Sequence, residues 1–282
     1  MTVRLICGDV LEVLPTIPAQ SIDAIITDPP YPEIDREYGR MTEADWWAMM
    51  MGVCAEARRV LKPTGSAVFI LQPNSRKVGS MRGWLWEFMA WVCREWNMVQ
   101  DAWWWNTSAI PEAHAIQGRL MRPSVKACIW AGPAQCYRDQ SGVLWSESEG
   151  NIAKRATARA ERKYKPSGHS MNELAMSSAC LGRGGVTPYN LLPIKNGGAL
   201  CVGNTGHGAG TPLELAKWWT RYICPPGGTV LDPFVGSGTM MLAAMEYGCN
   251  GIGIDKMSKY IDIAQRRVDE KQPAMSFAEA AS

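Results

Sequence analysis

Several features that define large classes of protein are missing from this sequence. No hydrophobic run reaches the roughly 18 consecutive apolar residues that a membrane-spanning helix needs. The first 15 residues carry Asp9 and Glu12 within an apolar stretch, so we expect no secretion signal peptide. An excess of one charge is absent too, because the formal net charge is only +2. We therefore expect no membrane contact, and any binding of a polyanion has to depend on a local basic region.

Patterns of metal ligands are also missing. The sequence has 3 histidines, and none of its 9 cysteines has another cysteine within four positions along the chain. Structural zinc sites use closely spaced cysteine or histidine pairs, so we expect no metal site built by this protein. Cysteines in a chain without a secretion signal are typical of reduced thiols, and this predicts a cytoplasmic protein.

What is present is typical of an α/β protein. Of the 282 residues 46% are hydrophobic and 20% charged, which is enough apolar material for a large core. Apolar patterning predicts strands over residues 4–7, 22–27, 66–71, 99–105, 125–130, 228–232 and 251–255. It predicts helices over residues 43–61, 84–92, 213–223, 239–247 and 256–267. This alternation predicts a Rossmann-like, doubly wound and mostly parallel sheet with helices on both faces.

The alternation is interrupted between residues 131 and 199. This stretch is polar and rich in glycine, serine and arginine, and its basic side chains are concentrated over residues 154–165, where Glu161 is the single acid. We therefore expect one α/β domain built from residues 1–130 and 200–282, with residues 131–199 inserted as a separate region.

A glycine-rich turn follows a short apolar strand near the C-terminus. Asp232 ends the strand, and residues 233–239 read Pro-Phe-Val-Gly-Ser-Gly-Thr before an apolar helix begins. Such a turn lets a ligand approach bare backbone N–H groups at the helix N-terminus. The next strand ends at Asp255, 19 residues after Gly236, where a carboxylate can accept hydrogen bonds from ribose hydroxyls. Together these features predict a cofactor that contains a nucleoside.

The details of the turn favour one such cofactor. No lysine follows Gly238, so the turn is not a phosphate-binding P-loop, and Met241 replaces the third glycine of the dinucleotide-binding pattern. Asp232 would repel a pyrophosphate, whereas it suits the ammonium group of a methionine moiety. The turn therefore favours S-adenosylmethionine over a nucleotide or dinucleotide.

The sequence Asp28-Pro29-Pro30-Tyr31 follows the apolar strand expected at 22–27. Open α/β sheets bind ligands at the carboxyl ends of their strands, and the two proline rings make this corner rigid. The Asp28 carboxylate and the Pro29 carbonyl can both accept hydrogen bonds from one NH₂ group. That arrangement favours a pyramidal aromatic amine whose lone pair can attack a methyl group, and Tyr31 offers a face on which a planar base can stack. A base in a duplex must first flip out to reach such a site.

These motifs resemble those of the S-adenosylmethionine-dependent DNA amino-methyltransferases, which methylate adenine N6 or cytosine N4 in prokaryotes and phages. The order, with Asp-Pro-Pro-Tyr first and Phe-x-Gly-x-Gly last, is similar to the group labelled beta, and the resemblance covers about three quarters of the chain. It implies a site-specific DNA methyltransferase in the cytoplasm of a prokaryotic or phage-infected cell. The implied catalytic residues are Asp28, Pro29, Pro30 and Tyr31.

The resemblance also implies which residues contact the cofactor and the DNA. Thr211 stands where many relatives have a lysine before the proline. The implied cofactor-binding residues are Asp9, Asp28, His207, Thr211, Asp232, Phe234, Gly236, Ser237, Gly238, Thr239, Asp255 and Lys256. Since the family places target recognition in its variable region, DNA contacts are expected from Lys154, Arg155, Arg159, Arg162, Lys163, Lys165, His169 and Arg183. The other interpretation of the basic run is a solvated charged face.

Adenine N6 in double-stranded DNA is the acceptor that we favour, because relatives acting on cytosine often begin the tetrad with serine rather than with an acid such as Asp28. Cytosine N4 remains the alternative. The absence of a Pro-Cys pair argues against methylation of cytosine C5, which needs a thiolate nucleophile. Less favoured interpretations are a protein amide or structured RNA as acceptor, and an inactive DNA-binding relative.

The resemblance implies a homodimer, for which the tryptophan-rich segment 84–96 is a candidate contact. The target sequence and any restriction endonuclease partner are unknown from the sequence.

Overall fold

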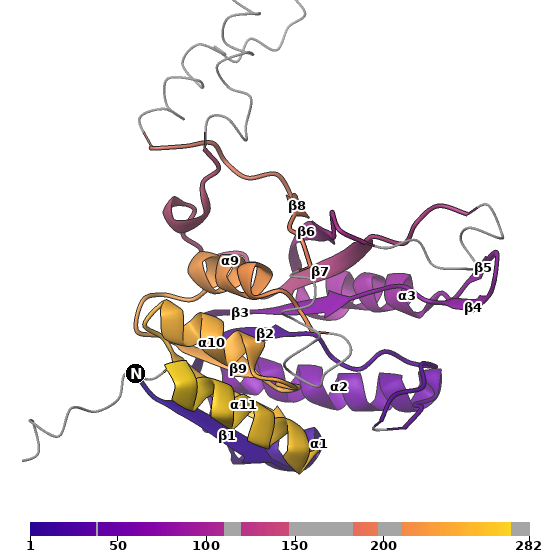
Figure 1. Ribbon diagram of the computed structural model, residues 1–282, viewed down its shortest axis with the longest axis horizontal. Helices are drawn as coiled ribbons and strands as arrows, with labels where there is room; N and C mark the ends of the chain where they lie inside the picture. Colours follow the sequence, from indigo (N-terminus) through magenta and orange to yellow (C-terminus); the bar gives the residue numbers. More distant parts are fainter. Residues whose placement is uncertain (38, 110–119, 147–182, 197–209, 272–282) are drawn as a thin grey trace, which may run out of the picture.

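A single eight-stranded sheet runs through the part of the chain that the computed structural model describes, residues 1–37, 39–109, 120–146, 183–196 and 210–271. The strand order is β1-β10-β9-β2-β3-β7-β6-β8 (Figure 1). The strands are β1 (Val3–Cys7), β2 (Ile22–Thr27), β3 (Leu61–Leu71), β6 (Met98–Trp105), β7 (Val125–Ala131), β8 (Leu191–Pro193), β9 (Thr229–Asp232) and β10 (Asn250–Asp255). A separate small hairpin pairs β4 (Ser75–Lys77) with β5 (Ser80–Met81).

Helices cover both faces of this sheet (Figure 1). The longer helices are α2 (Glu43–Val60), α3 (Trp84–Trp91), α9 (Leu213–Ile223), α10 (Thr239–Glu246) and α11 (Ser258–Lys271). The short ones are α1 (Val10–Val13), the 3₁₀ turns η1 (Leu14–Thr16) and η3 (Ser141–Val143), and a π-helical turn η2 (Val92–Trp96) that continues α3. Helices α1, α2 and α3 contribute to one apolar core cluster and α9, α10 and α11 to the other.

The sheet is mostly parallel, as the sequence predicts. Strands β1, β10, β9, β2 and β3 pair in parallel, while β7 pairs antiparallel with both β3 and β6. All six residues of β2 are buried, because each face of this central strand is covered by one of the two core clusters. Burial on both faces explains why the strand reads as a nearly continuous apolar run rather than as an alternating one.

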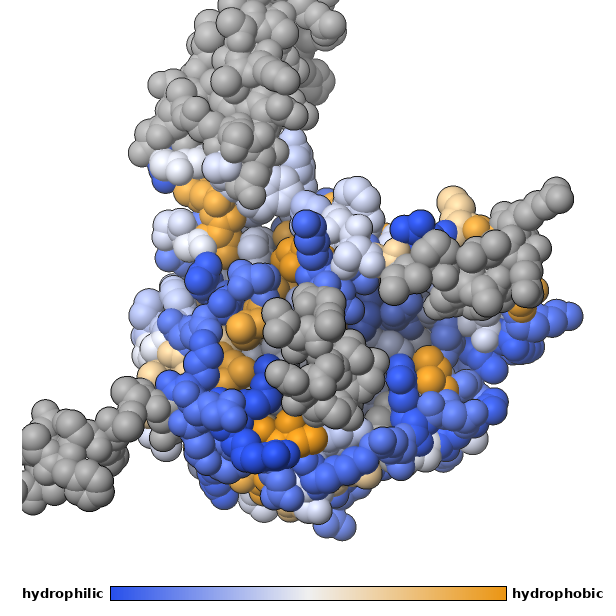
Figure 2. Space-filling view, in the orientation of Figure 1, coloured by the Kyte–Doolittle hydropathy of each residue, from blue (hydrophilic) through white to orange (hydrophobic). Residues whose placement is uncertain are grey.

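Ten of the 13 tryptophans lie in the core clusters or pack against them, in keeping with their apolar surroundings in the sequence. The largest fully buried side chains include Trp46, Trp84, Trp104, Trp130 and Trp219. Trp86, in the segment suggested as a dimer contact, is half exposed. Figure 2 shows that the visible surface is mainly hydrophilic with separate small hydrophobic areas, which is consistent with most apolar side chains lying in the two clusters.

Two local differences from the sequence-based expectations have clear causes. Residues 62–65 lie between the helix expected over 43–61 and the strand expected over 66–71. They belong to β3 as a bulge, because Leu61 pairs with Ile22 and Ser66 pairs with Ala24. The ends of the segment expected as a separate insertion pack on the domain: β8 pairs with β6, and Cys136 and Val143 are buried in the core cluster of α9. Residues 147–182 lie outside the described residues, so a separate region there stays a prediction.

Candidate active site

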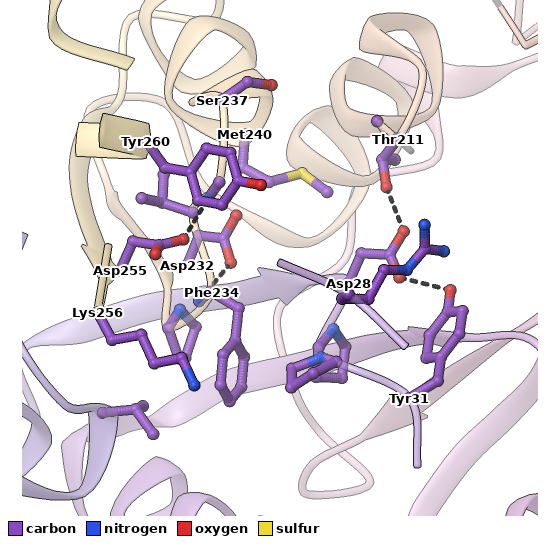
Figure 3. A pocket seen from close by; sticks show the side chains of 18 of the residues that line it. Asp28, Tyr31, Thr211, Asp232, Phe234, Ser237, Met240, Asp255, Lys256 and Tyr260 are labelled. Atoms are coloured by element: carbon purple, nitrogen blue, oxygen red, sulfur yellow. Dashed lines mark hydrogen bonds between the residues drawn. The ribbon is translucent and has the colours of Figure 1, made fainter. Parts of the chain in front are cut away.

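A cavity of about 650 Å³ lies at the carboxyl ends of β2, β9 and β10. Its walls contain the whole Asp28–Tyr31 corner together with Asp232, Phe234 and Asp255. Parallel pairing of β2 with β9, and of β9 with β10, brings these three strand ends to one edge of the sheet, although the corners are some two hundred residues apart in sequence. Figure 3 shows Asp28 and Tyr31 on one side of the cavity, and Asp232, Asp255 and Tyr260 on the other. The two sequence motifs therefore share one site.

One buried hydrogen bond connects the two motifs directly. Thr27 is the last residue of β2 and is completely buried, and its hydroxyl donates to Asp232 Oδ1 at 2.6 Å. Phe234 N–H donates to the same oxygen at 3.1 Å. Burial is the main cause that raises the pKa of the Asp232 carboxyl to about 7, and the nearby Asp28 and Asp255 carboxylates raise this pKa further.

The Asp-Pro-Pro-Tyr corner is fastened to α2 and to the segment after β3. The Trp46 indole N–H donates to the Pro30 carbonyl at 2.7 Å, and the Asn74 amide donates to the Pro32 carbonyl at 2.7 Å. The Pro29 carbonyl accepts no hydrogen bond from the part of the chain that the structure describes. Pro29 therefore presents an acceptor whose neighbours along the chain are held rigidly.

Three side chains donate hydrogen bonds to the Asp28 carboxylate. Tyr31 Oη donates to Oδ1 at 2.6 Å, whereas Thr211 Oγ1 and Lys126 Nζ donate to Oδ2 at 2.8 and 3.1 Å (Figure 3 shows the first two). Lys126 Nζ also donates to the Tyr31 hydroxyl at 2.8 Å. A carboxylate has about four lone-pair positions, so these three bonds leave capacity for one further donor. Asp28 is partly exposed, with 20% of its side-chain surface accessible from the cavity side.

The glycine turn is shaped by backbone geometry and by Asp255. Gly236 and Gly238 have φ of 48° and 83°, in the left-handed region that glycine adopts without strain. A Cβ atom on Gly238 would lie 2.9 Å from Ala264 Cβ of α11, so this residue must also be small. Asp255 accepts hydrogen bonds from Gly236 N–H at 3.1 Å and from Met257 N–H at 2.9 Å. The carboxylate at the end of β10 therefore holds the turn as well as facing the cavity.

The remaining expected cofactor residues divide into three groups. Asp9 caps α1, with Oδ1 accepting from Leu11 N–H at 2.9 Å, and lines the cavity. Ser237, Thr239 and Lys256 line it too, whereas Gly238 packs behind it. His207 is outside the described residues.

The expected DNA contacts lie almost entirely outside the described residues. This holds for Lys154, Arg155, Arg159, Arg162, Lys163, Lys165 and His169. Arg183 is described, is exposed, and donates to Thr187 Oγ1 at 3.1 Å and to Gln140 Oε1 at 3.5 Å. A role for these residues in DNA binding stays a prediction.

Sequence reasoning missed Lys126 and Thr27 as parts of the site. Lys126 is the single charged residue of β7, and a cation within an apolar strand next to the expected insertion is a signal that could have drawn attention to it. Thr27 offers less of a signal, because a threonine in a buried strand is ordinary. Sequence reasoning also did not predict that Arg267 of α11 contacts Ser237 and Thr239 in the turn.

Comparison with known proteins agrees with this geometry. The chain matches the DNA methylase family of N6/N4 methyltransferases over residues 22–266. It is 27% identical over 277 residues to the DNA adenine methyltransferase YhdJ of Escherichia coli K12, covering 94% of this chain and 82% of that protein. It is 25% identical over 273 residues to the type II methyltransferase M.PvuII of Proteus hauseri, covering 90% of this chain and 80% of that protein.

Solved structures share the fold. PvuII DNA methyltransferase, described as cytosine-N4-specific, superposes with a TM-score of 0.70 at 20% identity, covering 99% of this chain and 90% of that one. The putative DNA modification methylase TTHA0409 of Thermus thermophilus, in complex with S-adenosylmethionine, superposes with a TM-score of 0.58 at 19% identity, covering 98% of each chain. The Rossmann-like fold expected from the sequence is thereby confirmed. With the family match spanning both cavity motifs, this chain belongs to the N6/N4 family of DNA methylases.

Proposed function

We propose that this protein transfers a methyl group from S-adenosylmethionine to the exocyclic N6 amine of an adenine flipped out of double-stranded DNA, at a specific target sequence. The observation that carries the proposal is the shared cavity, in which the Asp28–Tyr31 corner faces the glycine turn and Asp255. The family to which the chain belongs acts on exocyclic amines of DNA bases, and the Asp28 and Pro29 residues that line this cavity each offer an acceptor for such an amine.

The cavity residues fit S-adenosylmethionine. The cavity is large enough for a nucleoside with a methionine chain, and a Cβ on Gly238 would disturb the turn that bounds it. Asp9, Asp255 and Tyr260 line this cavity, and Asp255 is the residue proposed to accept hydrogen bonds from the ribose hydroxyls. Phe234 and Met240 supply apolar walls, and Asp232 lines the cavity where the turn begins. When bound, the cofactor supplies an electrophilic methyl group on a sulfonium.

Asp28 and Pro29 orient the amine that receives the methyl group. The amine donates one hydrogen to the remaining lone-pair position of the Asp28 carboxylate and the other to the Pro29 carbonyl. Two acceptors fixed in this way favour a pyramidal nitrogen, so its lone pair is no longer delocalised into the ring. When the N–C bond forms, the bond from the methyl group to the sulfonium breaks and its electron pair stays on sulfur. The amine nitrogen, now cationic, must lose one proton, and the Asp28 carboxylate is the acceptor proposed to be in contact with it. The rigid corner provides this geometry before the base arrives.

Recognition of DNA follows from the same chemistry. The amine of a paired adenine is hidden in the duplex, so the target base has to be extruded into the cavity. The basic run at 154–165 is the proposed contact to the phosphate backbone. The homodimer stays a prediction from resemblance.

Cytosine N4 is the second candidate acceptor. It is favoured by the cytosine-N4-specific description of PvuII methyltransferase, which has a TM-score of 0.70 with this chain. Adenine is favoured by the acid at position 28 and by the 27% identity to a DNA adenine methyltransferase. DNA from cells that express the protein should be digested and its nucleosides separated by mass spectrometry. N6-methyldeoxyadenosine supports the proposal, whereas N4-methyldeoxycytidine alone would assign the second candidate.

The role of Asp28 is tested by Asp28→Asn. The amide keeps the shape of the side chain but removes the negative charge and turns one acceptor into a donor. We expect methyl transfer to fall by about a hundredfold to ten-thousandfold, with S-adenosylmethionine affinity largely retained. The matched control is Asp269→Asn on the surface of α11, where the carboxylate contacts only Gln265 among the described side chains. Transfer by Asp28→Asn at the rate of the control would rule out this assignment.

A further inference from the structure

Lys126 occupies an unusual position for a charged residue. It is the second residue of β7, its side chain is only 18% exposed, and it lines the cavity beside Asp28. Its ammonium group lies 5.3 Å from the centre of the Tyr31 ring and 5.3 Å from that of Trp104. The Tyr31 hydroxyl, the Trp104 ring and the Asp28 carboxylate therefore hold the ammonium in one place, since a cation over the face of an aromatic ring is attracted by it.

The Lys126 ammonium has more donor hydrogens than acceptors among the described residues. The ammonium has three hydrogens, and described residues accept two of them, at Asp28 Oδ2 (3.1 Å) and at the Tyr31 hydroxyl (2.8 Å). A third donor therefore remains next to the carboxylate that is proposed to hold the target amine. The lone-pair position still open on this carboxylate is on Oδ1, because Oδ2 already accepts from Lys126 and Thr211, whereas Oδ1 accepts from Tyr31 alone among the described residues. Oδ1 and the Lys126 ammonium, which contacts the other oxygen of the same carboxylate, can receive two neighbouring atoms of a base edge, provided that one of them donates and the other accepts.

We propose that Lys126 donates this third hydrogen to the ring nitrogen next to the target amine, N1 of adenine or N3 of cytosine, and so selects the base. The inference rests on the proposed function of the cavity. Enzymes that act on flipped bases read them through hydrogen bonds to the Watson–Crick edge. Adenine and cytosine both present an amine beside a ring nitrogen that accepts, which is the complement of Asp28 beside Lys126. On its Watson–Crick edge guanine has an N–H beside its amine, so that ring nitrogen would oppose the ammonium, and thymine has no amine.

The same hydrogen bond has a chemical consequence. The ring nitrogen carries an in-plane lone pair that is not delocalised, so it competes with the amine as a nucleophile. A donor hydrogen directed at that lone pair occupies it and leaves the amine as the group that reacts. Lys126 thus favours adenine or cytosine as the base that is bound, and the exocyclic amine as the nitrogen that is methylated.

A role confined to positioning is the competing explanation, since Lys126 also contacts Asp28 and Tyr31. The two explanations differ for a base that lacks the ring nitrogen. We therefore choose a duplex that contains the target site found by modified-base sequencing of DNA from expressing cells. The target base is either natural or replaced by its deaza analogue, 1-deazaadenine or 3-deazacytosine, and kcat/KM is measured for wild type and for Lys126→Met.

For wild type, we expect the deaza analogue to lower kcat/KM by about tenfold to a hundredfold, the effect of one hydrogen bond to a charged donor. We expect Lys126→Met to show a similar loss on the natural base and to lose little more with the analogue, because the donor is already gone. Lys271→Met is the control, since Lys271 pairs with Glu246 at the last turn of α11 and is absent from the cavity wall. This control should keep the full penalty for the analogue.

Three outcomes would overturn the inference. If replacing the target base by its deaza analogue lowers the kcat/KM of wild type by less than about threefold, the inference is overturned. This outcome is measured on wild type alone, so it does not depend on whether Lys126→Met folds. An equal penalty in wild type and in a Lys126→Met protein that binds S-adenosylmethionine normally would assign Lys126 to positioning alone. Failure of wild type to methylate either adenine or cytosine in DNA would instead overturn the proposed function, and the inference with it.

Discussion

At the scale of single residues, the cavity brings together acids in different environments. Asp28 is partly exposed and surrounded by three donors, whereas Asp232 is 3% exposed and accepts from Thr27 and Phe234 through one oxygen. Burial therefore dominates for Asp232 and raises its pKa to about 7. The sequence alone shows two aspartates at strand ends, and only the environment of each distinguishes their chemistry.

The raised pKa of Asp232 makes a prediction about stability. Between about pH 4 and about pH 7 the native state holds a proton that the unfolded chain releases, so the free energy of unfolding falls as pH rises through this window. Above pH 7 this contribution no longer changes. In Asp232→Asn the uncharged amide keeps an oxygen for the Thr27 and Phe234 donors. The part of the pH dependence of the unfolding free energy that comes from the Asp232 carboxyl should therefore disappear.

Urea unfolding of both proteins across this range tests the prediction. The difference in unfolding free energy between Asp232→Asn and wild type should grow with pH, with a slope of up to about 1.4 kcal/mol per pH unit. The exposed variant Asp269→Asn serves as the control and should show a constant difference from wild type. A constant difference for Asp232→Asn as well would contradict the raised pKa.

At the scale of elements, the glycine turn between β9 and α10 depends on its packing against α11. The left-handed φ of Gly238 is expected from the sequence pattern, because a strand that turns sharply into a helix needs such residues. The contact of Gly238 with Ala264 is not expected from the sequence pattern, because the position of α11 against the turn is set by tertiary packing. The same applies to Arg267, which reaches from α11 back to Ser237.

Gly238→Ala and Gly248→Ala separate these two requirements. Both glycines have positive φ, 83° and 71°, but no atom lies within 4 Å of a Cβ placed on Gly248. Gly248→Ala should destabilise the protein by about 1–2 kcal/mol through backbone strain alone. Gly238→Ala should add a further 1–3 kcal/mol or so through crowding against Ala264.

Chemical unfolding gives the stabilities, and calorimetric titration gives the affinity for S-adenosylmethionine. Only Gly238→Ala should weaken cofactor binding, since only that turn borders the cavity. Equal effects of the two variants on stability would show that crowding is absent.

At the scale of the whole molecule, the cavity exists only when the sheet is assembled. Its walls come from β7, β9 and β10, from the segments that follow β1 and β2, and from the segment just before α9, so the unfolded chain has no equivalent site. A ligand that binds only the native state stabilises it by mass action. S-adenosylmethionine at about a hundred times its Kd should therefore add about 2.7 kcal/mol to the free energy of unfolding.

Thermal unfolding with and without the cofactor measures this effect. A shift in Tm of about 5–10 °C is expected for a chain of this size. ATP and NAD at the same concentration are controls, because the turn lacks the lysine and the third glycine that these ligands need. A larger shift with either control than with S-adenosylmethionine would contradict the assigned cofactor.

Local sequence determined the elements and the two motifs of the site. Apolar periodicity, proline and glycine act within a few residues, so β2, α2, α9 and the strand-turn-helix around Gly236 were predictable to within a few residues. Tertiary structure decided what meets across the sheet. The bond from Thr27 to Asp232, the Lys126 ammonium at Asp28 and the pairing of β8 with β6 join residues separated by between 88 and 205 positions, and no local preference encodes them. They arise because strand order and burial bring those side chains to one edge or one face, which is a property of the folded sheet.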